Sequence, residues 1–153
     1  SRAFFEAAGD LLNRLRASRK PVALAYLDCD HFKQVNDEQG HDAGDEVIRQ
    51  IGGVLRGNVR STDLFARLGG DEFAVLMPDI TSQNAGERME DLRLAIQTQM
   101  STGGWPVTVS VGVVWYETSP DPAREMVRSA DDLMYEAKAA GRNNVTLRVL
   151  SHT

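Results

Sequence analysis

At residues 64–77 the sequence reads LFARLGGDEFAVLM, two apolar segments on either side of a Gly-Gly pair. Glycine supplies the positive φ angles that tight turns require, so this stretch predicts a β-hairpin that turns at Gly69 and Gly70. Asp71 and Glu72 leave that turn and place two carboxylates at the tip of the hairpin. Because acidic residues are common in turns, the pattern alone slightly favours a purely structural turn over a site.

Apolar residues recur at helical or strand-like spacing in the rest of the chain. The predicted helices span residues 3–18, 43–56, 84–97 and 123–139, with Gly141 capping the last, and the further predicted strands span residues 22–27, 107–113 and 145–150. This order predicts an α+β domain with a mostly antiparallel sheet of about five strands flanked by helices. The phosphate-loop patterns GxGxxG and GxxxxGK[ST] do not occur, which argues against a doubly wound nucleotide-binding fold.

Acidic residues also follow the first predicted strand, which stops at Asp28-Cys29-Asp30. If the hairpin lies beside this strand, Asp28, Asp71 and Glu72 converge at one edge of the sheet. Mg²⁺ prefers such oxygen ligands, and with substrate phosphates it can orient an attacking hydroxyl and neutralise phosphoryl charge. A metal site is therefore the alternative to a structural turn.

The composition restricts the class of protein. The chain has 153 residues, enough for one domain, and its formal net charge of −5 argues against general DNA or RNA binding. The single Cys29 cannot form an internal disulfide, which fits a reducing compartment. No apolar run approaches the length of a membrane span. The sequence thus predicts a cytoplasmic domain without membrane contact of its own, and leaves open a membrane attachment elsewhere in the full-length protein.

The segment Gly69-Gly70-Asp71-Glu72-Phe73 is identical to the signature of the GGDEF family, the diguanylate cyclases. Other blocks resemble the family in the same order, namely DCDHFK at 28–33, ND at 36–37, GH at 40–41, GD at 44–45, ARL at 66–68, MP at 77–78, SVG at 110–112, residues 130–138, and GRN at 141–143. The resemblance implies a palm-like, nucleotidyl-cyclase-like domain over residues 1–153. It also implies the activity, a metal-dependent condensation of two GTP into cyclic di-GMP plus pyrophosphate.

The same resemblance implies roles for the acidic residues. Asp28, Asp71 and the main-chain carbonyl of Cys29 would bind Mg²⁺ or Mn²⁺. Gly70, Asp71 and Glu72 would form the catalytic turn, with Glu72 as a further metal ligand or as the group that helps to deprotonate the attacking 3′-hydroxyl. These two roles of Glu72 stay open.

The resemblance further implies a set of substrate-binding residues, which are Phe32, Lys33, Asn36, Asp45, Gly69, Lys138 and Arg142. An amide and a carboxylate suit the donors and acceptors on the edge of guanine, so Asn36 and Asp45 would read the base. Lys33, Lys138 and Arg142 would meet phosphates. Without the resemblance, a turn residue explains Asn36 and a helix N-terminal acid explains Asp45 equally well. For Lys138 and Arg142, interaction with the dipole at a helix C-terminus is then the default explanation.

A regulatory element is implied by Arg60-Ser61-Thr62-Asp63, which five residues separate from Gly69. The family's inhibitory product site has the form RxxD at this spacing, so Arg60 and Asp63 would bind cyclic di-GMP. A further basic residue is expected on the following helix, where the sequence offers both Arg88 and Arg93.

Three points concern assembly and rival functions. The chain begins within the region expected for the first helix, so we interpret it as an N-terminally truncated fragment of a larger protein. Because the reaction joins two GTP molecules by two equivalent bonds, we expect the catalytic form to be a homodimer. The alternatives are a non-catalytic module that binds cyclic di-GMP or GTP, and a palm-type polymerase or other nucleotidyl cyclase, to which the guanine-reading pair and the charge lend no support.

Overall fold

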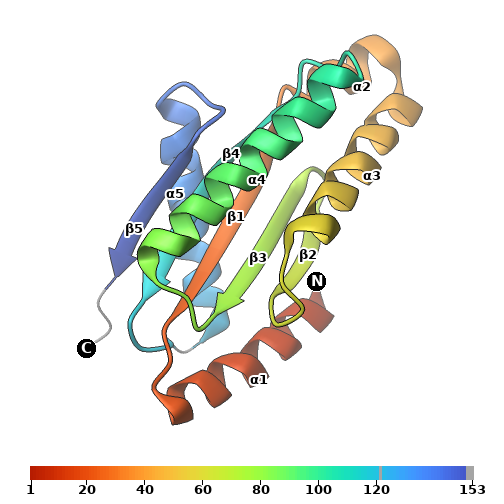
Figure 1. The fold of residues 1–153 in the computed structure, drawn as a ribbon. Coiled ribbons are helices and arrows are strands. Elements are labelled where there is room, and N and C mark those ends of the chain that lie inside the picture. The colour runs from red at the N-terminus through yellow and green to blue at the C-terminus, as the bar shows by residue number, and fades with distance from the viewer. Residues whose placement is uncertain (121, 151–153) are drawn as a thin grey trace.

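A computed structural model describes residues 1–120 and 122–150 as helices and strands around a single sheet (Figure 1). The helices are α1 (Arg2–Ser18), α2 (Phe32–Gln39), α3 (His41–Asn58), α4 (Ser82–Thr102) and α5 (Ala123–Ala139). The strands are β1 (Val22–Asp30), β2 (Leu64–Gly69), β3 (Glu72–Pro78), β4 (Thr108–Tyr116) and β5 (Val145–Leu150).

The strands lie in the order β2-β3-β1-β4-β5, which makes β1 the central strand. β1 runs antiparallel to β3 and β4, and β2 and β3 form the predicted antiparallel hairpin. β5 alone pairs in parallel, with β4, and α5 provides the crossover that a parallel pair requires. The predicted α+β fold with a mostly antiparallel sheet of five strands is confirmed.

Apolar residues fill a core on each face of the sheet, because successive side chains of a strand point to opposite faces. Ala23, Ala25 and Leu27 of β1 pack into one core with α3 and α4. Leu24 and Tyr26 pack into the other core with α1 and α5. Figure 1 shows α4 and α5 on opposite sides of β1. The same alternation places the side chains of residues 28 and 30 on the α5 side.

Two parts of the sequence prediction are wrong. Residues 32–39 form α2, which escaped detection because Val35 is its sole buried residue and the helix lacks an apolar stripe. The first strand does not stop at residue 27 but continues to Asp30, because residues 28–30 pair with residues 108–110 of β4. The acidic residues therefore lie on the last part of the central strand, where two neighbouring strands fix their direction.

Gly112 of β4 lets α5 approach the sheet closely. A Cβ at this position would lie 2.3 Å from the carbonyl oxygen of Ala130 and 2.4 Å from the amide nitrogen of Met134, both helix backbone atoms that cannot move independently. We expect Gly112→Ala to lower the free energy of unfolding by about 3 kcal/mol or more, measured by urea denaturation. Gly53→Ala is the control: apart from the adjoining residues of its own helix, no described atom lies within 4 Å of a Cβ built there, and better helix propensity should raise stability by about 1 kcal/mol. An unchanged urea midpoint in Gly112→Ala would contradict the close packing of α5.

Candidate active site

Three carboxylates meet at the ends of the central strands. Asp28 lies directly opposite Glu72 in the β1–β3 ladder, and Asp71 occupies the turn before Glu72. Each of the three offers one oxygen, and these oxygens all lie within 4.8 Å of one another. The structure thus brings together the three acids that the sequence predicted to converge, at the end of the central strands rather than at an outer edge.

The Gly-Gly turn is pinned to β1 by its backbone. Gly70 has a φ of 38°, the left-handed conformation for which the sequence predicted glycine. The amide of Cys29 donates a hydrogen bond to the carbonyl oxygen of Asp71 at 3.2 Å, and Arg67 Nε donates to the carbonyl of Gly70 at 2.8 Å. The position of Asp71 relative to Asp28 is therefore fixed by main-chain contacts.

Asp28 has a raised pKa and one carboxylate oxygen without a hydrogen-bond donor among the described residues. Burial, and next the negative charge of Asp71, raise the pKa of Asp28 to about 7, while the Lys138 ammonium opposes this rise. Lys138 Nζ lies 3.5 Å from Oδ2, but within residues 1–120 and 122–150 no donor reaches the buried Oδ1. Three converging carboxylates with one unpartnered oxygen fit a hard divalent cation, which would satisfy that oxygen and relieve the repulsion.

Tyr26 is a functional neighbour that sequence reasoning missed. Its hydroxyl donates a hydrogen bond to Glu72 Oε2, and burial together with this carboxylate raises the pKa of Tyr26. The contact fixes the orientation of the Glu72 carboxylate at the cluster. The available signal was a tyrosine at an otherwise apolar position, two residues before Asp28 and so on the same face of β1.

The predicted guanine-reading pair lies where α2 meets α3. The side chain of Asn36 packs so closely on Gly44 that a Cβ there would lie 1.9 Å from Asn36 Oδ1 and 3.3 Å from the ring of Phe32. Asp45 follows Gly44 on α3 and is exposed. Gly44 therefore allows Asn36 and Phe32 to pack directly on α3, at the residue that precedes Asp45.

The predicted phosphate-binding cations lie on two elements. Lys33 is exposed in the first turn of α2, whereas Lys138 lies in the last turn of α5 and reaches the carboxylate cluster. Gly141 sits one residue beyond the last helical cap and donates to the carbonyl of Lys138, so the predicted helix stop is placed correctly. Arg142 follows in this turn and is exposed.

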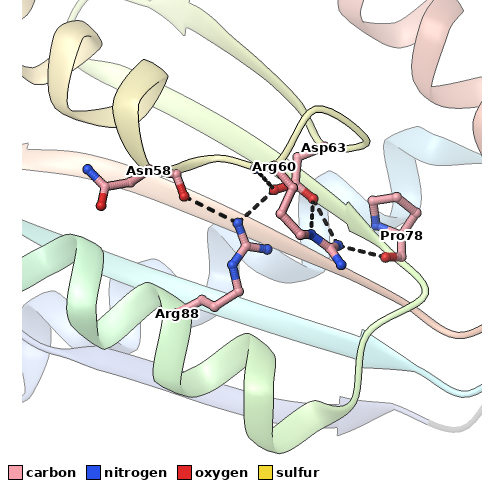
Figure 2. Close-up of polar contacts among 5 residues, drawn as sticks. All are labelled: Asn58, Arg60, Asp63, Pro78 and Arg88. Atoms are coloured by element: carbon pink, nitrogen blue, oxygen red, sulfur yellow. Dashed lines mark hydrogen bonds and ion pairs between the residues drawn. The ribbon is translucent and has the colours of Figure 1, made fainter.

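The RxxD segment forms a second polar cluster, drawn in Figure 2. Asp63 Oδ1 accepts from Arg60 Nη2 at 2.9 Å, and Asp63 Oδ2 accepts from Arg88 Nη2 at 2.7 Å. The side chain of Asp63 is fully buried, whereas those of Arg60 and Arg88 are 39% and 22% exposed. Asp63 therefore holds two guanidinium groups at the surface, beside a groove of about 440 Å³ that both arginines line.

The structure separates the two basic residues that the sequence left open. Arg88 joins the RxxD cluster, whereas Arg93 pairs with Glu90 and donates to Asn143 Oδ1 at 2.7 Å. Arg60 Nη2 also donates to the carbonyl of Pro78, the last residue of β3, whereas Glu72 is its first residue. Six steps along a strand span about 20 Å, so the arginine cluster lies at the opposite end of the sheet from the carboxylates.

Among the described residues, no helix combines the length and the apolar character that crossing a lipid bilayer would require.

Comparison with known proteins gives one family over most of the chain. Residues 1–144 match the family model described as the GGDEF domain of diguanylate cyclases. The probable diguanylate cyclase DgcT of Escherichia coli (strain K12) is 38% identical over 139 residues, which are 86% of this chain and 30% of that protein. Response regulator PleD of Caulobacter vibrioides is 38% identical over 146 residues, which are 88% of this chain and 31% of that protein. The chain thus spans about a third of the length of these curated relatives.

Solved structures show the same fold. The GGDEF domain of TpbB from Pseudomonas aeruginosa superposes with a TM-score of 0.87 at 34% identity, covering 97% of this chain and 96% of that chain. The GGDEF domain of DgcB from Caulobacter crescentus, solved in complex with c-di-GMP, superposes with a TM-score of 0.87 at 30% identity, covering 95% of this chain and 88% of that chain. The palm-like cyclase fold predicted from the sequence is confirmed.

Proposed function

Because the chain belongs to the GGDEF family of diguanylate cyclases, we propose that it condenses two GTP molecules into cyclic di-GMP. In each half of the reaction, the 3′-hydroxyl oxygen of one GTP forms a bond to the α-phosphorus of the other. The bond between that phosphorus and the bridging oxygen to the β-phosphate breaks, and pyrophosphate leaves with the electron pair. Two such steps give cyclic di-GMP, two pyrophosphates and two protons. We assign residues 1–153 to one catalytic domain, which would supply one half of this reaction.

The observation that supports this proposal is the cluster of Asp28, Asp71 and Glu72 with its unpartnered Oδ1. Asp28, Asp71 and the carbonyl of Cys29 would hold Mg²⁺ or Mn²⁺. Such a cation, when bound, neutralises phosphoryl charge and lowers the pKa of an attacking hydroxyl. Glu72, oriented by Tyr26, would complete the ligand set or accept the proton of the 3′-hydroxyl.

The substrate would lie between the α2–α3 contact and the end of α5. Asn36 and Asp45 would bind the guanine edge, and Phe32 would line its pocket. Gly69 would let the nucleotide approach the turn, and Lys33, Lys138 and Arg142 would bind the phosphates. Holding the reacting groups in this order supplies much of the rate enhancement in phosphoryl-transfer chemistry.

A homodimer would complete the catalyst, since the described residues contain one carboxylate cluster and the product has two equivalent phosphodiester bonds. Each domain would bring one GTP to the interface. The Arg60–Asp63 motif would bind the product at the far end of the sheet, with the Arg60 guanidinium as the contact and the buried Asp63 carboxylate holding it in place. The bound product would inhibit the enzyme by holding domains apart from the productive pairing.

The direct test is to incubate the protein with GTP and Mg²⁺ and to separate the products by chromatography. We expect cyclic di-GMP and pyrophosphate, with a specific rate that rises with protein concentration as dimers form. Tight binding of GTP or cyclic di-GMP without turnover at any concentration would instead identify a non-catalytic binding module.

Asp45→Ala tests base recognition. A site that pairs hydrogen-bond groups with guanine leaves buried groups unpaired when adenine enters, so we expect the wild type to prefer GTP over ATP strongly. Removing the Asp45 carboxylate should lower kcat/KM for GTP by on the order of 100-fold and narrow the ratio between the two nucleotides. Asp42→Ala is the control, because Asp42 is an exposed acid in the first turn of the same helix. Equal use of ATP and GTP by the wild type would contradict the assignment.

A further inference from the structure

Asp30 is a fully buried carboxylate with no role in the function proposed above. Its side chain has no solvent exposure. Oδ1 accepts from Ser110 Oγ at 2.7 Å and contacts Lys138 Nζ at 3.4 Å. Oδ2 accepts from Thr108 Oγ1 at 2.7 Å and from the amide of Asn143 at 3.1 Å.

These four donors come from separate parts of the chain. Ser110 and Thr108 belong to β4, Lys138 to the last turn of α5, and Asn143 to the turn between α5 and β5. Moving a carboxylate out of water costs several kcal/mol, and this cost offsets much of the gain from its hydrogen bonds. A contribution to stability alone therefore does not explain why a charged residue is buried at this position. The arrangement is better explained by what the carboxylate holds in place.

One of the held parts is a turn in an unfavourable conformation. Gly141, Arg142 and Asn143 have φ values of 119°, 65° and 50°, three consecutive residues in the left-handed region. Residues with a side chain adopt this region with difficulty, so outside contacts must maintain it. The hydrogen bond from the Asn143 amide to Asp30 ties this turn to the end of the central strand.

The other held part is the Lys138 ammonium. It lies 3.5 Å from Asp28 Oδ2 and 3.4 Å from Asp30 Oδ1, between the two carboxylates. If Asp28 were its only partner, the ammonium would compete directly with any cation that Asp28 binds. Asp30 offers a second anion that is not part of the cluster of Asp28, Asp71 and Glu72, so the ammonium stays in place whichever partner Asp28 takes.

We propose that Asp30 is a positioning residue that fixes Lys138 and the Arg142 turn for the terminal phosphates of the substrate. The inference rests on the proposed function, in which Lys138 and Arg142 bind the triphosphate. Asp30 touches neither the nucleotide nor the reacting atoms. It acts through Lys138 and through the backbone of residues 141–143.

Asp30→Asn is the sharpest test. Each carboxylate oxygen takes two donors, so an amide nitrogen in either position must face Lys138 or the Asn143 amide, neither of which accepts a hydrogen bond. We would measure binding of GMP and of α,β-methylene-GTP, a triphosphate that the reaction cannot cleave, by calorimetry. Affinity for the triphosphate should fall about tenfold, the effect of one charge-assisted contact, while affinity for GMP changes less than about twofold.

A double-mutant cycle with Lys138→Ala separates positioning from general damage to the fold. If Asp30 acts largely through Lys138, Asp30→Asn should weaken triphosphate binding much less in the Lys138→Ala background than in the wild type. An equal loss of affinity for both nucleotides, or full additivity in the cycle, would show a merely structural role and overturn the inference.

A second variant serves if Asp30→Asn does not fold. The double variant Thr108→Val with Ser110→Ala keeps the charge and removes two neutral donors that orient it. It should weaken triphosphate binding about threefold and spare GMP. If this double variant binds the triphosphate as tightly as the wild type, the inference about Asp30 is wrong but the proposed function stands. If the wild type itself binds neither nucleotide, the proposed function is wrong as well.

Discussion

Asp71→Asn should lower the rate of cyclic di-GMP formation by roughly 10³-fold or more, while the fold is kept. The substitution changes neither volume nor the main-chain bond between Asp71 and Cys29. It removes one of three carboxylates that converge on a common point. A bound metal ion lowers the barrier to phosphoryl transfer by several kcal/mol, and each reduction of about 1.4 kcal/mol corresponds to a factor of ten in rate. Loss of the metal site should therefore reduce the rate by this large factor.

Asp71→Asn, which should lower the rate, should at the same time stabilise the metal-free protein. The charge of Asp71 helps to raise the pKa of Asp28, so the two carboxylates repel each other when no cation is bound. Asp71→Asn should therefore raise the thermal midpoint without Mg²⁺ and reduce the increase that Mg²⁺ produces in the wild type. Thermal unfolding with and without Mg²⁺ measures both effects independently of turnover.

Asp79→Asn is the control for charge removal, because Asp79 is exposed and its cation partner, Lys20, lies 3.9 Å away at the surface. It should leave the rate and the Mg²⁺ effect within about twofold of the wild type. A wild-type rate in Asp71→Asn would remove Asp71 from the metal site, and the cluster would then be a structural feature of the turn.

The sequence predicted the fold well where periodicity is strong. The hairpin at residues 64–77 and the amphipathic α3 and α5 follow directly from apolar spacing, since burial determines both elements. The short α2 was missed because packing against α3, through Asn36 and Phe32 on Gly44, replaces the apolar stripe that marks most helices. The end of β1 was misplaced because pairing with β4 keeps acidic residues in the strand.

The candidate site could be predicted only in part, for a physical reason. The Gly-Gly turn is local in sequence, and the register of β1 against β3 follows from their shared pattern. The supporting residues come from distant segments: Tyr26 lies 46 residues from Glu72, and Lys138 lies 108 residues from Asp30. The first contact depends on the exact pairing of β1 with β3, and the second on how α5 packs on the sheet, which no local pattern reveals.

The choice between Arg88 and Arg93 shows the same limit. Both residues are basic and lie on α4. The helix directs Arg88 to Asp63 and Arg93 to Glu90 and Asn143, so they serve different ends of the sheet. The sequence is compatible with either residue, and the register of α4 against the sheet decides between them.

Arg60→Ala and Arg88→Ala should each weaken binding of cyclic di-GMP by about 10- to 100-fold, the value of one charge-assisted contact between a guanidinium group and a phosphate. Both side chains line the same groove and are partly exposed, so a ligand seated there can contact either guanidinium group. Calorimetry with cyclic di-GMP measures the affinity, and progress curves measure the relief of inhibition.

Each single variant should fold, because Asp63 keeps one arginine partner in either case. The double variant would leave a fully buried carboxylate without a cation and should lose several kcal/mol of stability. This contrast separates the positioning role of Asp63 from direct product binding. The single variants therefore report on the product, and the double variant reports on the fold.

Arg93→Ala is the matched control on the same helix, and its affinity for cyclic di-GMP should stay within about twofold of the wild type. The initial rates of Arg60→Ala and Arg88→Ala should also be preserved, because about 20 Å of β3 separates Pro78 from the carboxylate cluster. Inhibition that is relieved while initial rate is retained requires two distinct sites coupled through the arrangement of domains. Unchanged product affinity in both arginine variants would instead assign the cluster a structural role, that of fastening the loop before β2 to the end of β3.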